Sequence, residues 1–309
     1  LFFFKHTTAS EMLRSLVGSE MCIRDRPMMD EVSSENFELV EEEVRDIEDG
    51  EILVKNLYLS FDPTQRGWLN DVPSYIPPVE IGEVMRASSV GRVIESKNEN
   101  FSPEDIVQGS FGWQEYAVSG GSSGFMPPQK LPEGISPTSA LSIYGITGLT
   151  AYFGLFHIGQ PQSGKTIVIS GATGTVGSTV GQLAKIKGCQ VIGITSSDEK
   201  IKYLTENLGF DGAVNHKAIN DLSSTLQNLC PEGIDIYFDN VGGSITDTVI
   251  PLLNVKARVA VCGQSSQYNL ENKEISIFAV VKNYGRLFPY ISSIIMCCGL
   301  SVSYTHLRA

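Results

Sequence analysis

The chain has 309 residues, of which 42% are hydrophobic and 19% are charged, and this composition excludes a disordered protein or a single small module. Its 35 acidic and 23 basic residues give a formal net charge of −12, which argues against a binder of nucleic acid or of an anionic membrane. No apolar run reaches the ~20 residues of a membrane-spanning helix, and six irregularly spaced cysteines indicate a reducing compartment, the cytoplasm.

The two ends of the chain differ from the rest of it. Residues 1–26 lack an initiator Met and the long apolar run of a signal peptide. They resemble the conceptual translation of sequencing-adapter read-through, and residues 301–309 resemble the same artefact from the other end. We therefore expect both ends to be artefactual or disordered, and the natural protein to have been cut at both. A genuine but unstructured tail is the alternative.

Residues 27–140 are typical of a small β-rich domain. Carboxylates crowd the segment before Asp49, which indicates a solvated turn there. The apolar, partly alternating run Glu51–Ser60 predicts a strand, and a proline-rich loop follows at residues 61–78. Two more short strands are predicted at Gly91–Ser96 and Trp113–Val118.

Between residues 141 and 300, apolar strands alternate with helices. Predicted helices cover Ser139–His157 (interrupted at Gly145 and Gly148), Ser178–Lys187 and Asp198–Leu208. Predicted strands cover Thr166–Ser170, Gln190–Thr195, Ala213–Val214, Ile234–Asp239, Arg258–Cys262 and Ile294–Leu300. This alternation predicts an α/β fold with a parallel, doubly wound sheet.

The segment Gly171–Gly177 joins a predicted strand directly to a predicted helix. Glycines at such a turn let the backbone approach a pyrophosphate, whose charge lies at the helix N-terminus. We interpret it as a dinucleotide-binding loop, against a tight turn used only for packing. The string Gly159–Thr166 matches the phosphate loop of nucleotide hydrolases letter for letter, but here the helix precedes and the strand follows. That order is the reverse of what hydrolysis needs, so we interpret it as a turn.

The end of the second strand favours NADPH over NADH. An NAD enzyme usually carries Asp or Glu there, to hold the ribose hydroxyls. Here the residues are Thr195–Ser197, with Lys200 one helical turn on, and hydroxyls plus an ammonium suit a 2′-phosphate. Asp198 and Glu199 stand nearby and weaken this argument, and an exposed helix lysine is the alternative role of Lys200.

Seven stretches carry a family resemblance. They are residues 56–68, 74–87, 145–155, 169–189, 195–200, 235–243 and 257–269, which span nearly all of residues 36–300. Jointly they resemble the zinc-independent alkenal/prostaglandin reductase branch of the medium-chain dehydrogenase/reductase family. The resemblance implies a GroES-like β-rich catalytic domain, incomplete here, and a Rossmann domain. It also implies reduction by NADPH of the carbon–carbon double bond of α,β-unsaturated aldehydes or ketones.

The same resemblance assigns candidate site residues. The pyrophosphate loop comprises Gly171, Gly174, Thr175, Val176, Gly177 and Ser178, and Lys200 is the 2′-phosphate ligand. The cofactor-contacting loops after the fourth and fifth strands comprise Asn240, Cys262, Gly263, Gln264, Ser265, Ser266, Gln267 and Tyr268. Candidate substrate-pocket residues are Thr64, Trp68, Tyr75 and Ile146.

Three departures from the family pattern stand out. His216 replaces the tyrosine that many members have beside the adenosine phosphate, where an imidazole would stack or, protonated, face the phosphate. Thr64 stands where plant members carry a pocket tyrosine, so their substrates do not carry over. We also expect the family's last 50 or so residues, which complete the catalytic domain, to be missing.

Cysteines and histidines lack the spacing of a zinc site, so we expect no metal. Tyr268 is the candidate catalytic residue, as proton donor after hydride transfer; the competing view is that it only orients the ribose and water supplies the proton. We expect a homodimer joined through the Rossmann edge strand at residues 292–300. The alternative functions are an NADPH:quinone reductase of the same family and a cofactor-binding protein without turnover.

Overall fold

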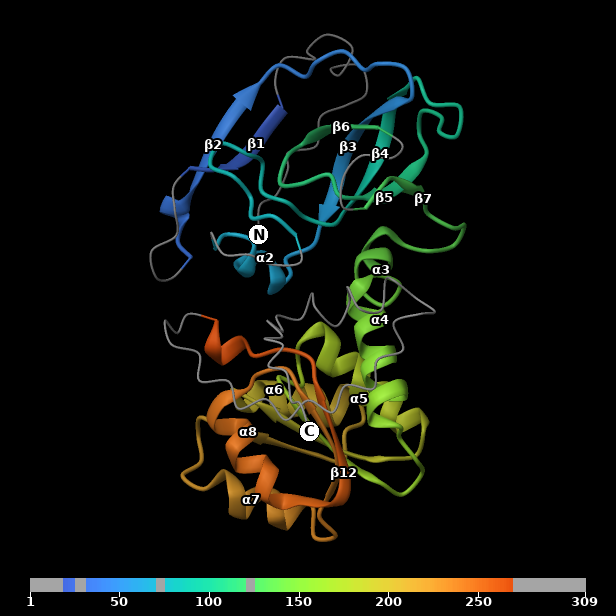
Figure 1. The fold of residues 1–309 in the computed structure, drawn as a ribbon. Coiled ribbons are helices and arrows are strands. Elements are labelled where there is room, and N and C mark those ends of the chain that lie inside the picture. Colours follow the sequence, from blue (N-terminus) through green and yellow to red (C-terminus); the bar gives the residue numbers. More distant parts are fainter. Residues whose placement is uncertain (1–18, 26–31, 71–75, 121–125, 269–309) are drawn as a thin grey trace, which may run out of the picture. The chain divides into compact units, whose positions relative to one another are not determined.

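The computed structural model describes residues 19–25, 32–70, 76–120 and 126–268. The chain divides into two compact units, Leu1–Leu141 and Ser142–Ala309, and Figure 1 labels their elements. Unit 1 contains antiparallel β-sheets, and unit 2 has a parallel sheet with helices on both faces. The predicted fold class, a β-rich part followed by a doubly wound α/β part, is therefore confirmed.

Unit 1 is built on a five-stranded antiparallel sheet with the strand order β6-β3-β4-β5-β7. Its strands are β3 (Glu51–Leu59), β4 (Ser89–Ser96), β5 (Ile106–Gly109), β6 (Tyr116–Gly120) and β7 (Gln129–Lys130). Residues Ile52 and Val54 alternate along β3 and are fully buried against Val93 and Val107. This apolar row fixes the register of β3, and the strand predicted at Glu51–Ser60 is correct to within one residue.

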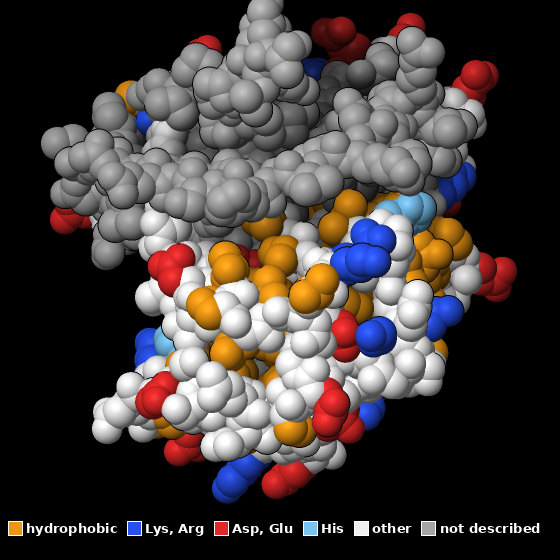
Figure 2. Space-filling model, turned by 60° about the horizontal axis from the view of Figure 1, so that its bottom comes forward, with side chains coloured by type: hydrophobic (Ala, Val, Ile, Leu, Met, Phe, Trp, Pro, Cys, Tyr) orange, Lys and Arg blue, Asp and Glu red, His pale blue; other side chains and the backbone are white. Residues whose placement is uncertain are grey.

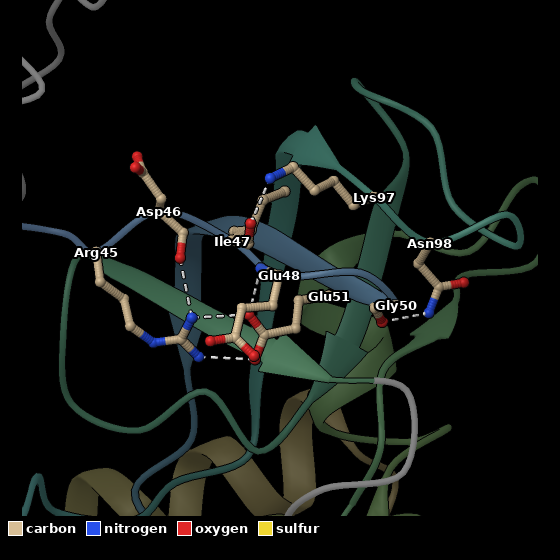
Figure 3. A network of polar contacts seen from close by, with 8 residues as sticks. All are labelled: Arg45, Asp46, Ile47, Glu48, Gly50, Glu51, Lys97 and Asn98. Carbon is tan, nitrogen blue, oxygen red and sulfur yellow. Dashed lines mark hydrogen bonds and ion pairs between the residues drawn. The ribbon is translucent and has the colours of Figure 1, made fainter.

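The carboxylate-rich segment before β3 is tied to the sheet by a polar network (Figure 3). The Arg45 guanidinium donates to both carboxylate oxygens of Glu51, at 2.7 and 2.8 Å. These hydrogen bonds lower the pKa of Glu51 from 4.5 to about 2. The Lys97 ammonium donates to the carbonyl of Ile47 at 2.6 Å. The segment is therefore tied to the start of β3 and to the residue after β4, and the predicted turn is present at Asp49.

A second, two-stranded sheet pairs β1 (Ser19–Arg24) with β2 (Phe37–Glu42), which follows the short 3-10 helix η1 (Ser34–Asn36). Strand β1 lies within the segment 1–26 that we expect to be artefactual or disordered, and this expectation about the segment stays a prediction. The Cys22 N–H donates to the carbonyl of Trp113 at 2.8 Å. Arg24 is buried, and its guanidinium donates to the carbonyl of Val79. Backbone pairing on both edges thus holds this strand in unit 1.

Two other predictions in unit 1 need correction. The proline-rich loop contains a short helix, α2 (Thr64–Gly67). Strand β6 begins at Tyr116 and not at Trp113, because the residues between them pair with β1 instead, as the Glu115 N–H does with the carbonyl of Glu20 at 2.9 Å. Unit 1 ends with helix α3 (Pro137–Leu141).

Unit 2 contains a five-stranded parallel sheet with the order β10-β9-β8-β11-β12. The strands are β8 (Thr166–Ser170), β9 (Gln190–Thr195), β10 (Gly212–Asn215), β11 (Ile234–Asp239) and β12 (Leu253–Val261). The predicted bounds of β8, β9 and β11 are confirmed to the residue. Chain order reverses at the central strand β8, so the sheet has its topological switch point there.

Helices cover both faces of this sheet. They are α4 (Ile146–Phe153), η2 (Gly154–Gly159), α5 (Thr175–Ile186), α6 (Asp198–Lys202), η3 (Tyr203–Asn207), α7 (Leu222–Leu229), α8 (Gly243–Val249) and η4 (Ile250–Leu252). Leu155, Val180 and Leu204 pack on one face, and Leu226 and Val249 pack on the other. In Figure 1, α4 and α5 lie on one side of β12 and α7 and α8 on the opposite side.

Three differences from the sequence predictions concern this unit. The first predicted helix is interrupted at Gly145, as expected, but α4 runs through Gly148 without a break. The glycine at that position serves close packing, because the backbone of Ile143 leaves no room there for a side chain. The helix predicted from Ser178 starts at Thr175, and β12 starts five residues before the predicted Arg258. The last predicted strand, residues 294–300, lies outside the described residues.

No helix in the described ranges is long and apolar enough to cross a membrane.

Candidate dinucleotide site

The glycine loop follows β8 and opens α5 at the switch point of the sheet. Gly171 has a φ of +57°, in the left-handed region that favours glycine. Gly174 is the N-cap of α5, and no side chain caps the helix. The first N–H groups of this helix of 12 residues therefore lack intrahelical partners. Together with the helix dipole they form a site for a phosphate group.

Gly177 supports the loop from behind. A Cβ on Gly177 would lie 2.5 Å from the carbonyl oxygen of Gly171 and 2.9 Å from the Cα of Ala172. Its absence lets α5 pack closely on the loop. Gly174 and Thr175 are exposed and Val176 is half-buried, so the anion would lie against these positions and not against Gly177. Ser178 donates its hydroxyl to the carbonyl of Thr175 at 3.2 Å.

The end of β9 presents hydroxyls and an ammonium. The Lys200 Nζ donates to the Ser196 hydroxyl at 3.3 Å, and Ser197 caps α6 by accepting from the Lys200 N–H at 3.3 Å. The Asp198 carboxylate accepts from the Asn215 amide at 2.9 Å. Asp198, one of the two acids that weaken the argument for a 2′-phosphate, thus has its carboxylate engaged by a neighbouring side chain.

His216 adjoins this end of the sheet, because its N–H donates to the carbonyl of Thr195 at 3.0 Å. Burial, with the charge of Lys217 second, lowers the pKa of His216 below its ordinary value of 6.5. Burial thus opposes protonation of the imidazole, and both predicted roles of His216, stacking and, when protonated, facing the phosphate, stay predictions.

The loops after β11 and β12 are joined to each other. The Asn240 amide donates to the carbonyl of Ser170 at 2.7 Å, and the Ser266 hydroxyl donates to the carbonyl of Val241 at 2.7 Å. The Tyr268 hydroxyl lies 3.3 Å from the place that a Cβ on Gly263 would take. Residues Cys262–Tyr268, which include the 3-10 helix η5 (Ser265–Gln267), thus form one surface with Asn240.

The remaining predicted residues are dispersed. Thr64 and Trp68 belong to unit 1, and Trp68 is only 8% exposed within a hydrophobic cluster. Ile146 begins α4 in unit 2. Tyr75 lies outside the described residues. In the segment Gly159–Thr166, which matches the phosphate loop of nucleotide hydrolases, the Lys165 ammonium forms an ion pair with Asp235 at 3.0 Å. It is thus engaged with a carboxylate.

Sequence reasoning missed one residue at this edge of the sheet, Asp239. Asp239 at the end of β11 accepts hydrogen bonds from the hydroxyls of Ser170, Tyr237 and Thr246. Polar residues at the ends of buried strands were the available clue, since parallel strands bring their carboxyl ends to one edge. Across the described ranges, no group of three or more His, Cys, Asp or Glu residues could hold a metal ion.

Two family models match the chain, "N-terminal domain of oxidoreductase" over residues 20–126 and "Zinc-binding dehydrogenase" over residues 175–292. The NADPH-dependent curcumin reductase of Escherichia coli strain K12 is 46% identical over 76% of this chain and 67% of that protein. Prostaglandin reductase 1 of Rattus norvegicus is 42% identical over 76% of this chain and 69% of that protein.

Solved structures give the same family. CurA from Vibrio vulnificus, crystallised in complex with NADPH, superimposes with a TM-score of 0.76 at 38% identity, covering 90% of this chain and 79% of that one. The chain spans about two thirds of the length of the curated relatives, 65% to 69% in three of them. Sequence identity and fold agree over both units. The chain therefore belongs to the medium-chain dehydrogenase/reductase family.

Proposed function

We propose that the protein uses NADPH to reduce the carbon–carbon double bond of α,β-unsaturated aldehydes and ketones. The observation that carries this proposal is the uncapped α5 at the glycine loop, next to an uncharged end of β9 that presents Lys200. The similarity to reductases named for curcumin and for prostaglandin supports the class of substrate.

The residues of unit 2 fit NADPH along its length. Gly174 and the first N–H groups of α5 would hold the pyrophosphate. Lys200 and Ser196 would bind the 2′-phosphate, and His216 would stack on the adenosine. The loop Cys262–Tyr268 would then line the nicotinamide side, since the dinucleotide crosses the switch point from β9 towards β11 and β12.

When bound, NADPH supplies a hydride to the β-carbon of the substrate, and the enolate that results gains a proton at its α-carbon. We propose Tyr268 as the residue that stabilises the enolate charge and donates this proton. In the alternative, Tyr268 holds the ribose hydroxyl and water supplies the proton. The assignment of Thr64, Trp68, Tyr75 and Ile146 to the substrate pocket stays a prediction from the sequence.

We propose that the reaction proceeds without zinc. Zinc is held by groups of cysteine, histidine and carboxylate side chains. The cysteines and histidines of the sequence lack the spacing of such a site, and among the described residues no group of three or more His, Cys, Asp or Glu could hold a metal ion.

We further propose a cytoplasmic homodimer joined through the edge of the Rossmann sheet. The edge strand predicted for this contact, residues 292–300, lies outside the described residues. In the described part of the chain β12 is the outermost strand on that side, and its Val255 is 94% exposed. Figure 2 brings forward a face of unit 2 on which hydrophobic side chains gather. An exposed apolar strand edge favours pairing with a second copy, and the free cysteines of the described ranges are consistent with a reducing compartment.

The test is consumption of NADPH by the full chain with a linear 2-alkenal, with a quinone, and with both together. The proposal expects turnover of the alkenal and competitive inhibition of quinone turnover by it. Faster turnover of the quinone would favour the quinone reductase. Tight NADPH binding without turnover of either would favour a cofactor-binding protein.

A further inference from the structure

Asp239 is a buried acid that neither hydride transfer nor the cofactor contacts above employ. It is 2% exposed, and its carboxylate accepts five hydrogen bonds. Donors to Oδ1 are the hydroxyls of Ser170 (2.7 Å) and Tyr237 (2.9 Å) and the N–H groups of Val241 (3.0 Å) and Gly242 (2.9 Å), and the Thr246 hydroxyl donates to Oδ2. A buried carboxylate is stable because such donors replace its lost water.

The donors around Asp239 have a fixed direction. Burial, and then the charge of Asp239, raise the pKa of Tyr237, so the phenol keeps its proton and donates. The Ser170 hydroxyl donates to Asp239 and accepts from the Asn240 N–H at 2.9 Å. The Ser170 hydroxyl is thus held in one orientation between Asp239 and Asn240, and a buried polar network whose members are satisfied is rigid.

The residue ties together the ends of three strands. Ser170 ends β8 immediately before the glycine loop, and its carbonyl accepts from the Asn240 amide at 2.7 Å. The carbonyl of Asp239 itself accepts from the N–H groups of Cys262 at 2.8 Å and Gly263 at 3.1 Å. Asp239 therefore holds both the loop after β11 and the start of the loop after β12.

These loops lie on one side of the switch point. The 2′-phosphate residues Ser196 and Lys200 follow β9, while Asp239 and Gly263 follow β11 and β12, across the central strand β8. A dinucleotide that crosses β8 has its adenosine on the first side and its nicotinamide on the second. The Tyr268 hydroxyl lies over Gly263, on the side that Asp239 organises.

We infer that Asp239 is a positioning residue for the nicotinamide half of the cofactor, acting through Asn240 and Gly263 without touching the cofactor. This inference rests on the proposed function. It gives the buried carboxylate a task beyond stability. The carboxylate fixes the loop after β11, and the loop after β12 is attached there through the backbone carbonyl of Asp239, so both are ordered before the cofactor arrives and the ordering cost of binding is reduced.

The test is Asp239→Asn in the full chain, titrated with NADPH and with 2′,5′-ADP, which contains only the adenosine half. The amide keeps the shape of the side chain but removes the charge and replaces one acceptor with a donor. We expect the Kd for NADPH to rise about tenfold, equal to roughly 1.4 kcal/mol, while the Kd for 2′,5′-ADP stays within about twofold of the original.

Asp235→Asn is the matched control. Asp235 lies on the same strand, four residues earlier, and its carboxylate accepts from the Lys165 ammonium at 3.0 Å and the Thr166 N–H at 3.0 Å. It should lower the melting temperature and leave both Kd values unchanged. If Asp239→Asn does not fold, Thr246→Val and Thr246→Ser decide the matter, because only the serine keeps a hydroxyl donor to Asp239. The valine variant should weaken NADPH selectively and the serine variant should not.

Three outcomes are distinguishable. Equal weakening of NADPH and 2′,5′-ADP by Asp239→Asn would mean a general loss of structure and would overturn the inference. So would Thr246→Val and Thr246→Ser variants that bind NADPH equally well. Failure of the unchanged protein, once shown to be folded, to bind 2′,5′-ADP or NADPH would refute the proposed function itself, and the inference with it.

Discussion

Gly177 and Gly174 should differ sharply when each is replaced by alanine. The Cβ of Gly177→Ala would lie 2.5 Å from the carbonyl oxygen of Gly171 and 2.9 Å from the Cα of Ala172. Both are backbone atoms, so no rotamer change relieves the contact. Overpacking costs about 1–3 kcal/mol, and alanine in a helix interior recovers about 1 kcal/mol. We expect a net loss of up to about 2 kcal/mol, or a fall of up to about 8 °C in Tm for unit 2.

Gly174→Ala is the companion variant. Its Cβ would lie 3.3 Å from the nearest atom, the carbonyl oxygen of Gly171, and the backbone φ of −65° suits alanine. An alanine N-cap lowers stability by about 1 kcal/mol or less. The methyl group would, however, stand at the opening of the helix N-terminus, so the Kd for NADPH should rise tenfold or more.

Circular dichroism melts without ligand and calorimetric titrations with NADPH measure both effects. We expect Gly177→Ala to lower Tm more than Gly174→Ala does. Relative to its loss of Tm, Gly174→Ala should raise the Kd for NADPH more than Gly177→Ala does. A Gly177→Ala variant that melts above the original protein, gaining helix propensity at no packing cost, would refute the close packing of α5 on the loop. Unchanged NADPH affinity in Gly174→Ala would refute the assignment of this helix N-terminus to the pyrophosphate.

Three further predictions concern single side chains. Lys200→Ala should raise the Kd for NADPH by about 10-fold to 100-fold, the value of a hydrogen bond between charged groups, and leave the Kd for NADH unchanged in parallel titrations. Tyr268→Phe should lower kcat about 100-fold in steady-state assays if the hydroxyl donates the proton, whereas a raised KM for NADPH at constant kcat would assign it to the ribose. Glu51→Gln should lower Tm at pH 7, because Arg45 depresses the pKa of Glu51 to about 2 and the charged carboxylate therefore stabilises the fold. This stabilisation is present above pH 4.5 and is lost as the pH falls towards 2, so the melting curves of the variant and the original protein should converge in acid. A difference in Tm that does not change with pH would contradict the ion pair.

The sequence predicted β8, β9 and β11 more accurately than any other element. The strands β8, β9 and β11 are short apolar runs bounded by glycine or polar residues, and burial on both faces leaves their sequences little freedom. The start of α5 was missed by three residues because Gly174 is the cap, and a glycine cap gives no side-chain signal.

Strand β1 shows a different limit. Ser19–Arg24 has no distinctive pattern, and its place depends on backbone pairing with β2 and with Trp113, far along the chain. Pairings over such distances leave little trace in local sequence.

The glycine loop and Lys200 could be predicted from spacing, because their proposed chemistry follows from local order along the chain. Asp239 was not, since its role arises only when Ser170, Thr246 and Gly263 are brought to it by the sheet. In the same way, burial lowers the pKa of His216, and that shift, which sequence could not supply, favours a neutral ring.

The most direct test of the proposed cofactor is a calorimetric titration of the full chain with NADPH and then with NADH, with circular dichroism on the same sample to establish that it is folded. The proposal predicts tighter binding of NADPH by about tenfold or more, because Lys200 and Ser196 face a phosphate that NADH lacks. Equal affinities, a preference for NADH, or no binding by a folded sample would contradict it.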